Sequence, residues 1–160
     1  MIPAGQRCDN PRVIVRPLRP DDTLAAGRLV REGMQERWGS AYDPAFNTDV
    51  DDLWATYVVE RGADVRVAEL DGQVVAVGAL VPEGLGVGRL VRVATDAQHR
   101  RRGLGRTIIY ALSDAARERG MHTAIVATDI PWIDAIALYE ACGFVEHHRD
   151  DTDVHLSLML

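Results

Sequence analysis

From Arg89 to Arg119 the chain runs RLVRVATDAQHRRRGLGRTIIYALSDAARER, and this stretch decides the fold. Its first part, Arg89–Thr95, is rich in branched apolar residues and predicts a strand. A polar loop, Asp96–Arg102, follows. A helix is expected from about Gly103 to Arg119, because apolar residues recur there on one helical face. These residues are Ile108, Ile109, Leu112, Ala115 and Ala116. Gly120 gives the helix a typical stop.

The turn between this strand and this helix has the chemistry of an anion site. Gly103 and Gly105 allow the backbone to approach a ligand closely. The first N–H groups of a helix lack partners within the helix and carry partial positive charge, so such an end binds pyrophosphate readily. Four arginines surround the turn: Arg100, Arg101, Arg102 and Arg106.

Three other interpretations of this turn are a nucleotide P-loop, a dinucleotide-binding fingerprint and an ordinary helix start. A nucleotide P-loop requires G-x-x-x-x-G-K-S/T, and all 18 basic residues here are arginine. A dinucleotide fingerprint requires a third glycine where this chain has Ile108. An ordinary helix start with solvated arginines stays open on the turn alone.

The remaining pattern predicts one α+β domain over 1–160, with a mixed central sheet of about seven strands and about four helices. Residues 1–12 are expected to form a loose segment. The first helix is expected to begin with Asp21 and Asp22 as its cap. Asp71-Gly72 predicts a tight hairpin turn. The other expected strands are Val13–Pro17, Val65–Leu70, Gln73–Val81, His122–Ala127, Phe144–His148 and Val154–Leu160, and the other expected helices are Val50–Glu60 and Pro131–Cys142.

Composition narrows the function. The net charge of −6 argues against a nucleic-acid partner and suits a cationic substrate. The longest apolar run, Val74–Val81, is too short to cross a membrane, and the first residues do not resemble a signal peptide. The two cysteines, Cys8 and Cys142, are not needed as a disulfide framework. A cytoplasmic protein without membrane contact is therefore expected.

Two motifs resemble those of the GNAT superfamily of N-acetyltransferases. Arg100-x-x-Gly103-x-Gly105 is similar to the family's Q/R-x-x-G-x-G/A motif. The segment Ala135–Phe144, AIALYEACGF, resembles its A-x-x-L-Y-x-x-x-G-F block. The likeness extends from about Val65 to the C-terminus. It implies transfer of an acetyl group from acetyl-coenzyme A, as cosubstrate, to a primary amine by direct attack in a ternary complex, without a metal.

The resemblance also implies roles for individual residues. The coenzyme pyrophosphate would rest on the backbone of Arg101, Arg102, Gly103, Leu104, Gly105 and Arg106, with Arg100 opening the motif. The pantetheine arm would pair with Val93, Ala94 and Thr95. Tyr139 would act as general acid toward the leaving thiolate, although a plain core role for this residue is the alternative. Trp132 stands where many relatives have asparagine.

The general base is left open. Some relatives use a glutamate on the strand that here carries Arg92. Glu69, Glu83 and Asp129 lie at expected strand ends, and each is also well explained as a solvated surface carboxylate.

The amine acceptor is expected to be a small molecule. Aromatic residues gather in the region that walls the family's acceptor site: Trp38, Tyr42, Phe46, Trp54 and Tyr57. Four acids nearby would attract an ammonium group or cap helices: Asp43, Asp49, Asp51 and Asp52. The alternatives are a protein N-terminus or lysine as acceptor, or a non-catalytic acyl-coenzyme A sensor.

The C-terminal region raises two further points. His147, His148 and His155 could suggest a metal, but His147 and His148 are adjacent on an expected strand, so they point to opposite faces and cannot easily share one ion. A polar hairpin without metal is expected. Leu156, Leu158 and Leu160 would suit strand pairing across a homodimer.

Overall fold

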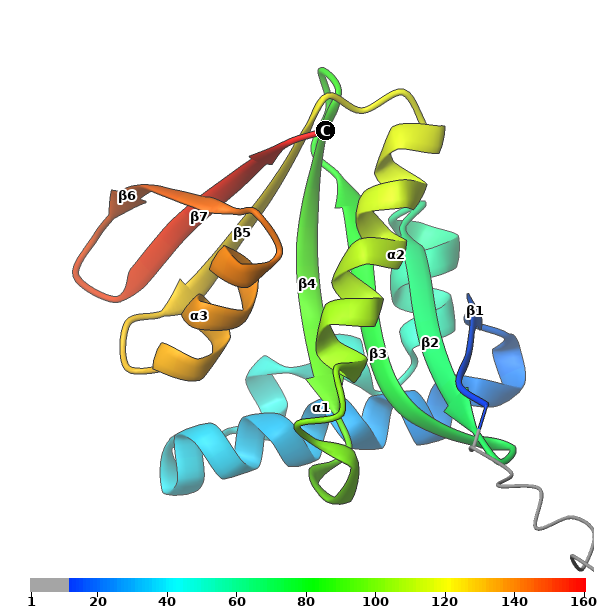
Figure 1. Ribbon diagram of the computed structural model, residues 1–160. Coiled ribbons are helices and arrows are strands. Elements are labelled where there is room, and N and C mark those ends of the chain that lie inside the picture. The colour runs from blue at the N-terminus through cyan, green and yellow to red at the C-terminus, as the bar shows by residue number, and fades with distance from the viewer. Residues whose placement is uncertain (1–11) are drawn as a thin grey trace, which may run out of the picture.

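The computed structural model describes residues 12–160, so the segment expected to be loose lies outside the described residues except for Arg12. The fold is a seven-stranded sheet in the order β1-β2-β3-β4-β5-β7-β6, flanked by helices (Figure 1). The strands are β1 (Ile14–Pro17), β2 (Asp64–Leu70), β3 (Gln73–Pro82), β4 (Val87–Thr95), β5 (Thr123–Asp129), β6 (Val145–Arg149) and β7 (Asp153–Met159). The helices are α1 (Thr23–Trp38), α2 (Leu104–Glu118) and α3 (Ile133–Ala141), with a π-helix, η5 (Trp54–Glu60). The expected α+β class and element order are confirmed.

The helix expected over Val50–Glu60 has a different internal form. A 3-10 turn covers Thr48–Val50, and the regular part is the π-helix η5. Asp52 caps this segment, because its Oδ1 accepts hydrogen bonds from the Ala55 N–H at 3.0 Å and from the Thr23 hydroxyl at 3.0 Å. Of the acids expected to cap helices here, Asp52 therefore takes that role for η5.

The start of α1 also differs from the expectation. Asp22 makes no side-chain cap on α1. Its carboxylate instead accepts two hydrogen bonds from Arg16, at 2.6 and 3.0 Å, and one from the Arg19 N–H at 2.7 Å. The strong guanidinium donor outcompetes the helix amides, because charge-assisted bidentate bonds are stronger than bonds to neutral N–H groups. The pair ties β1 to the start of α1.

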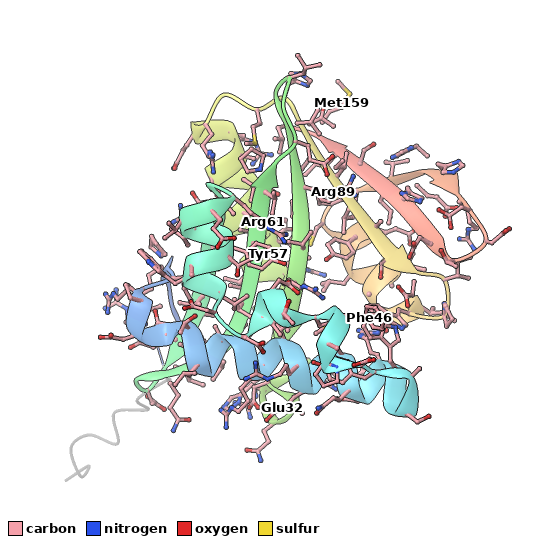
Figure 2. All side chains as sticks on the ribbon, turned by 180° about the vertical axis from the view of Figure 1, so that it is seen from behind. Glu32, Phe46, Tyr57, Arg61, Arg89 and Met159 are labelled. Carbon is pink, nitrogen blue, oxygen red and sulfur yellow. The ribbon has the colours of Figure 1, made fainter. Side chains whose placement is uncertain are left out.

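Two apolar cores lie on opposite faces of the sheet. One core joins α2 and α3 to the sheet, and Ile108, Ile109 and Leu112 are completely buried in it. The other core joins α1 and η5 to the sheet around Val50, Leu53 and Tyr57. Figure 1 shows α2 in front of the sheet and α1 behind it, and Figure 2 shows the α1 face from the other side. The apolar face predicted for α2 is confirmed.

A glycine fixes how closely α2 approaches the sheet. A Cβ on Gly78 of β3 would lie 2.7 Å from Cγ2 of Ile108 and 3.0 Å from Cδ1 of Leu112. Such distances are too short for carbon atoms, so only glycine allows the helix to pack this close. The contact sets the position of the N-terminus of α2 relative to β4, the neighbour of β3.

Strand β4 separates from β5 part-way along its length. The two strands pair in parallel only where Val87–Arg89 faces Thr123–Ile125. Beyond that ladder β5 continues to pair with β7 as far as Asp129. A bulge lies on the other side of β4, where Arg92 and Val93 together oppose Gly78, and Arg92 has a φ of 56°. The residues from Val91 to Asp96 are partly exposed although β4 is the middle strand of the sheet.

The C-terminal strand is enclosed within the sheet. β7 has β5 on one side and β6 on the other, so both of its edges are occupied by this chain. A dimer contact through this strand would therefore require β6 to move aside. Over residues 12–160, no helix combines the length and apolarity needed to cross a bilayer.

Candidate functional site

The turn at the start of α2 has the backbone of an anion-binding nest. Arg101 and Gly103 both adopt left-handed conformations, with φ of 60° and 78°. Such alternation makes successive N–H groups converge on one point. The first hydrogen bond into the helix runs from the Thr107 N–H to the Gly103 carbonyl at 3.0 Å. The N–H groups of Leu104, Gly105 and Arg106 consequently have no partner within the helix and point out of its end.

The space beside this turn is open. A Cβ on Gly103 would meet no other atom within 4 Å. The left-handed backbone, rather than crowding within the chain, is therefore what favours glycine at this position. An anion can approach the backbone here without displacing a side chain.

The four arginines of the motif have two different roles. Arg100 donates two hydrogen bonds of 2.6 Å to the carboxylate of Glu36, which ties the loop to α1. The ion pair raises the pKa of Arg100 and lowers the pKa of Glu36. Arg101, Arg102 and Arg106 are exposed and have no ion-pair partner within residues 12–160. These three side chains remain available to an anion.

The end of β4, the start of α2 and helix α3 meet at one place. A Cβ on Gly105 would lie 3.0 Å from Cδ2 of Leu138 and 3.8 Å from Oγ1 of Thr95. The fold thus brings the turn next to Val93–Thr95 and next to the helix that carries Tyr139. All three sequence segments expected at the site lie together.

Tyr139 is buried, with only 7% of its surface exposed. Its ring packs edge-on against Phe144, with the centroids 5.6 Å apart. Burial raises the pKa of the Tyr139 hydroxyl well above its usual value; Cys142 adds to this rise and Arg37 opposes it. Among residues 12–160 no side chain or backbone group forms a hydrogen bond with this hydroxyl. It is therefore a protonated donor that no protein group uses.

Cys142 lies close to Tyr139 and is also buried. Burial raises the pKa of its thiol, and the charge of Arg106 only partly offsets this. The thiolate is the nucleophilic form of cysteine, so a raised pKa disfavours covalent catalysis by Cys142.

A polar cluster beneath the bulge of β4 holds that strand to the segment before η5. Arg92 donates to both carboxylate oxygens of Asp49, each at 2.9 Å, and to Asn47 at 3.3 Å. The Tyr57 hydroxyl donates to the same carboxylate. Burial alone would raise the pKa of Asp49, but the bonds from Tyr57 and Arg92 and the charge of Arg92 together lower it. No local sequence signal predicts this cluster, because Arg92 and Asp49 are far apart in the chain.

The cluster has a consequence for the missing base. Strand β4 carries no acid, and its cation Arg92 is already neutralised by Asp49. Among Glu69, Glu83 and Asp129, Glu83 is paired with Arg89 and Glu69 with Arg16. Neither ion pair lies on the diverging part of β4.

Asp129 lies where β5 diverges from β4. The last paired residues of the two strands are Arg89 and Ile125, and Val93 and Asp129 each lie four residues beyond them. Asp129 accepts a hydrogen bond from the indole N–H of Trp38 at 2.8 Å. It thus connects the end of α1 to the opening between the two strands.

A pocket of about 410 Å³ lies at the end of α1. Its lining is Trp38, Ala41, Asp43, Phe46 and Asn47. Of the aromatic residues expected at an acceptor site, Trp38 and Phe46 line it, and Phe46 is 85% exposed. Tyr57 is buried in the core instead, and Trp54 borders a separate pocket of about 220 Å³. Of the four acids expected near the acceptor, Asp43 lines the larger pocket. The other three have different contacts. Asp49 binds Arg92, Asp51 lies 3.5 Å from Arg31, and Asp52 caps η5.

Trp132 closes the side of the site between α1 and α3. Its ring lies 5.5 Å from that of Trp38, and the Arg37 guanidinium lies 4.7 Å above it. Arg37 also donates to both oxygens of Asp134, at 3.0 and 2.9 Å. Where relatives offer an asparagine amide, this chain has an aromatic and cation contact that joins the two helices.

Comparisons with known proteins all lead to acetyltransferases. Residues 30–144 match the model of the Acetyltransferase (GNAT) family. N-acetyltransferase 8 of Rattus norvegicus is 30% identical over 122 residues, which are 73% of this chain and 55% of that protein. N-acetyltransferase 8 of Homo sapiens is 31% identical over 112 residues, which are 67% of this chain and 49% of that protein. The chain spans about half the length of these curated relatives.

Solved structures share the fold at low identity. The PaiA N-acetyltransferase from Thermoplasma acidophilum, in complex with coenzyme A, superposes with a TM-score of 0.79 at 12% identity, covering 93% of this chain and 99% of that one. The ribosomal-protein-S18-alanine N-acetyltransferase from Escherichia coli gives a TM-score of 0.72 at 24% identity, covering 92% and 94%.

The cluster beneath the bulge yields a stability prediction. Asp49→Asn should lower the free energy of unfolding at neutral pH by roughly 2 kcal/mol, since it leaves a partly buried guanidinium without its counter-charge. The pKa of Asp49 is lowered on folding, so its contribution is present above the ordinary value and is lost as pH falls through the folded value. Denaturant unfolding at pH 7 and near pH 3 measures both effects, and the difference between variant and native chain should shrink at the lower pH.

Asp51→Asn is the matched control, because Asp51 is a neighbouring acid whose side chain is 68% exposed. Equal losses in the two variants, or a loss at Asp49 that does not change with pH, would contradict this account of the cluster.

Proposed function

Since the chain belongs to the Acetyltransferase (GNAT) family, we propose that it transfers an acetyl group from acetyl-coenzyme A to a primary amine. The observation that carries this proposal is the meeting of the open nest at Gly103 with the unpaired edge of β4. Coenzyme A carries a pyrophosphate, which would bind the nest, and an extended arm with amide groups, which would pair with the strand edge, so the two features must lie side by side.

The residues present fit the coenzyme. Its pyrophosphate would bind the N–H groups of Leu104, Gly105 and Arg106. The exposed arginines around the turn would balance its charge. The amide groups of the pantetheine arm would pair with Val93–Thr95, whose edge toward β5 lacks a strand partner.

The reaction needs a donor for the oxyanion and a donor for the sulfur. The neutral amine nitrogen attacks the thioester carbon, and the carbonyl oxygen becomes negative as the tetrahedral intermediate forms. An N–H on the edge of β4 beyond its ladder with β5 would stabilise that oxygen. The carbon–sulfur bond then breaks, and the sulfur leaves as a thiolate.

Tyr139 is the donor for that sulfur. A phenol, with an ordinary pKa of about 10, is already a weaker acid than a thiol, whose pKa is about 8.5, and burial raises the pKa of Tyr139 further, so the hydroxyl stays protonated. We therefore assign to the hydroxyl a hydrogen bond that stabilises the departing thiolate, with the sulfur taking its final proton from water.

The proton of the attacking amine would pass to Asp129, directly or through water. This carboxylate lies where β4 and β5 diverge, and only its Oδ2 is engaged, by Trp38. The amine itself would sit in the pocket of Trp38, Asp43 and Phe46, where aromatic rings suit an apolar portion and the carboxylate attracts positive charge. A small amine is the proposed acceptor, and a protein amine is its competitor.

The activity itself is tested by release of coenzyme A thiol in the presence of small amines and of short peptides. Gly103→Glu should abolish turnover with every acceptor, because a carboxylate would stand in the nest. Gly120→Glu is the matched control: Gly120 ends the same helix, is also left-handed at 73°, and also has open space beside it. No release by the folded native chain with any amine would leave a coenzyme-binding sensor as the function.

Tyr139→Phe tests the hydroxyl. The ring contact with Phe144 is kept and no protein hydrogen bond is lost, so folding and coenzyme affinity should not change. The kcat should fall by about 100-fold or more if the hydroxyl assists the leaving group. An unchanged kcat would mean that Tyr139 serves only to pack the core.

Asp43→Asn and Phe46→Ala test the acceptor pocket. Asp43 Oδ1 caps the turn Pro44–Phe46 by accepting the Ala45 N–H at 2.9 Å, and asparagine is an equally good cap. Phe46 is exposed, so neither change should alter stability. Asp43→Asn should raise the KM for the amine by up to about fivefold, as for a charge pair near the surface. Phe46→Ala should also raise it, through the loss of an aromatic contact, and both variants should leave the KM for acetyl-coenzyme A unchanged. Leu24→Ala, which removes an exposed apolar side chain of α1 away from the pocket, is the control. Unchanged amine kinetics in both pocket variants would place the acceptor elsewhere.

A further inference from the structure

The hairpin of β6 and β7 contains a bulge that changes which histidine faces β7. Glu146 pairs with Leu156, and the next pair is His148 with His155, so His147 is the extra residue. In a regular antiparallel register His147 would stand opposite His155. The bulge replaces it with His148, and residues that are directly opposite point to the same face. The ring centroids of His148 and His155 lie 5.2 Å apart.

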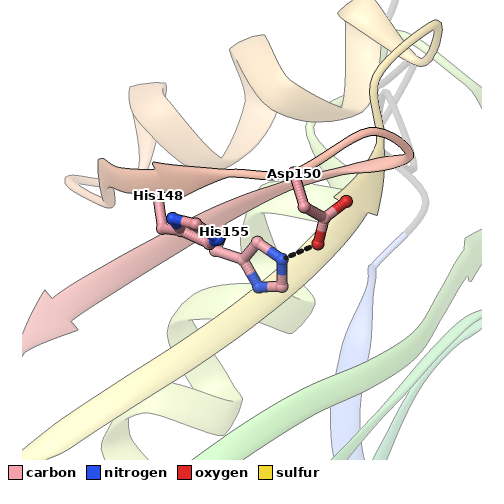
Figure 3. Close-up of side chains that lie close together, drawn as sticks. All are labelled: His148, Asp150 and His155. Carbon is pink, nitrogen blue, oxygen red and sulfur yellow. Dashed lines mark hydrogen bonds and ion pairs between the residues drawn. The ribbon is translucent and has the colours of Figure 1, made fainter.

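Asp150 brings a carboxylate to the same place from the turn of the hairpin. Its Oδ1 accepts bonds from the N–H groups of Thr152 and Asp153, both at 2.8 Å, which fixes the side chain. Its Oδ2 lies 2.8 Å from Nε2 of His155 (Figure 3). One nitrogen from each histidine and one oxygen of Asp150 all lie within 4.8 Å of one another.

We propose that His148, Asp150 and His155 form a binding site for a divalent transition-metal ion, with Zn²⁺ as the expected occupant. Two imidazoles and one carboxylate are a ligand set suited to Zn²⁺, Co²⁺, Ni²⁺ or Cu²⁺ rather than to Mg²⁺ or Ca²⁺. Ligand atoms bound to one such ion at about 2.0–2.1 Å stand roughly 3 Å apart. The Asp150–His155 pair already has this spacing, and a rotation of the exposed His148 ring would complete it.

The surroundings favour a cation at this position. Arg149, which precedes Asp150 in the chain, is held by Glu146 through bonds of 2.9 and 3.0 Å, so it does not occupy the carboxylate of Asp150. His155 sits on a strand that is paired on both sides, and its side chain is only 29% exposed. Two of the three ligands are therefore held in place before an ion binds, which lowers the entropy cost of binding.

The site lies apart from the coenzyme turn and on the other face of the sheet from α3. Val154 and Leu156 point into the core shared with α2 and α3, so the intervening His155 points to the face that carries α1. A three-ligand site leaves coordination positions for water. A bound metal would add a coordination link between His148 on the outermost strand β6 and His155 on β7, beyond the backbone hydrogen bonds of the hairpin.

The test is a titration of Co²⁺ and of Zn²⁺ into the full chain, prepared without a histidine tag. Co²⁺ binding is followed by its visible absorption and Zn²⁺ binding by calorimetry. One equivalent should bind, and a saturating ion should raise the Tm. His148→Gln and His155→Gln should each weaken binding by at least about tenfold, since loss of even an outer-sphere partner commonly costs that much.

His147→Gln is the matched control, because this neighbour is the bulged residue and lies outside the proposed ligand set. Its affinity should equal that of the native chain. The glutamine variants keep a polar side chain, and circular dichroism without metal verifies their folding. Absence of saturable binding, or binding that His148→Gln and His155→Gln leave unchanged, would overturn the proposal. An equal loss in His147→Gln would also overturn it. None of these three results would bear on acetyl transfer, which the titration does not use.

Discussion

Divergence of β4 from β5 is the constraint on which the rest of the site depends. A central strand normally has both edges paired, and the cost of leaving buried N–H and C=O groups without partners is high. Here β4 gives up its second partner after Arg89, and the bulge at Arg92 bends the strand at the same place. The groups exposed in this way remain favourable only if water or a ligand satisfies them. The edge of β4 beyond Arg89 is therefore open to pairing with water or with an extended ligand.

The bulge is held by charge rather than by packing. A left-handed conformation is costly for arginine, and the Arg92 side chain compensates by binding Asp49 and Asn47 beneath the sheet. The same contact fixes the segment that leads from the pocket at Phe46 to η5. The proposed coenzyme edge and the proposed acceptor pocket are thus linked through one guanidinium. This arrangement also explains why no acid stands on β4: a carboxylate at that position could not neutralise Asp49.

The parts of the fold that could be predicted from sequence are those with local causes. The apolar face of α2 follows from spacing alone, and the Asp71-Gly72 hairpin and the element order follow from turn residues and apolar runs. The candidate turn could be found because its glycines and arginines are consecutive. Pairings between distant residues could not be predicted. The sequence suggests that Asp49 attracts an ammonium group or caps a helix, and capping is a local role. Its actual partner, Arg92, becomes a neighbour only after the sheet forms. The bulge at His147 could not be predicted from the sequence for the same reason, since strand register depends on the partner strand.

The central claim is that an anion on the α2 turn and an amide arm on β4 occupy one continuous site. Amide NMR spectra of the ¹⁵N-labelled chain, recorded while coenzyme A is added, test it most directly. The account predicts saturable shifts of the Leu104, Gly105 and Arg106 amides together with those of Val93–Thr95, at a common affinity. Shifts confined to one of these segments, or found only elsewhere in the sheet, would contradict it.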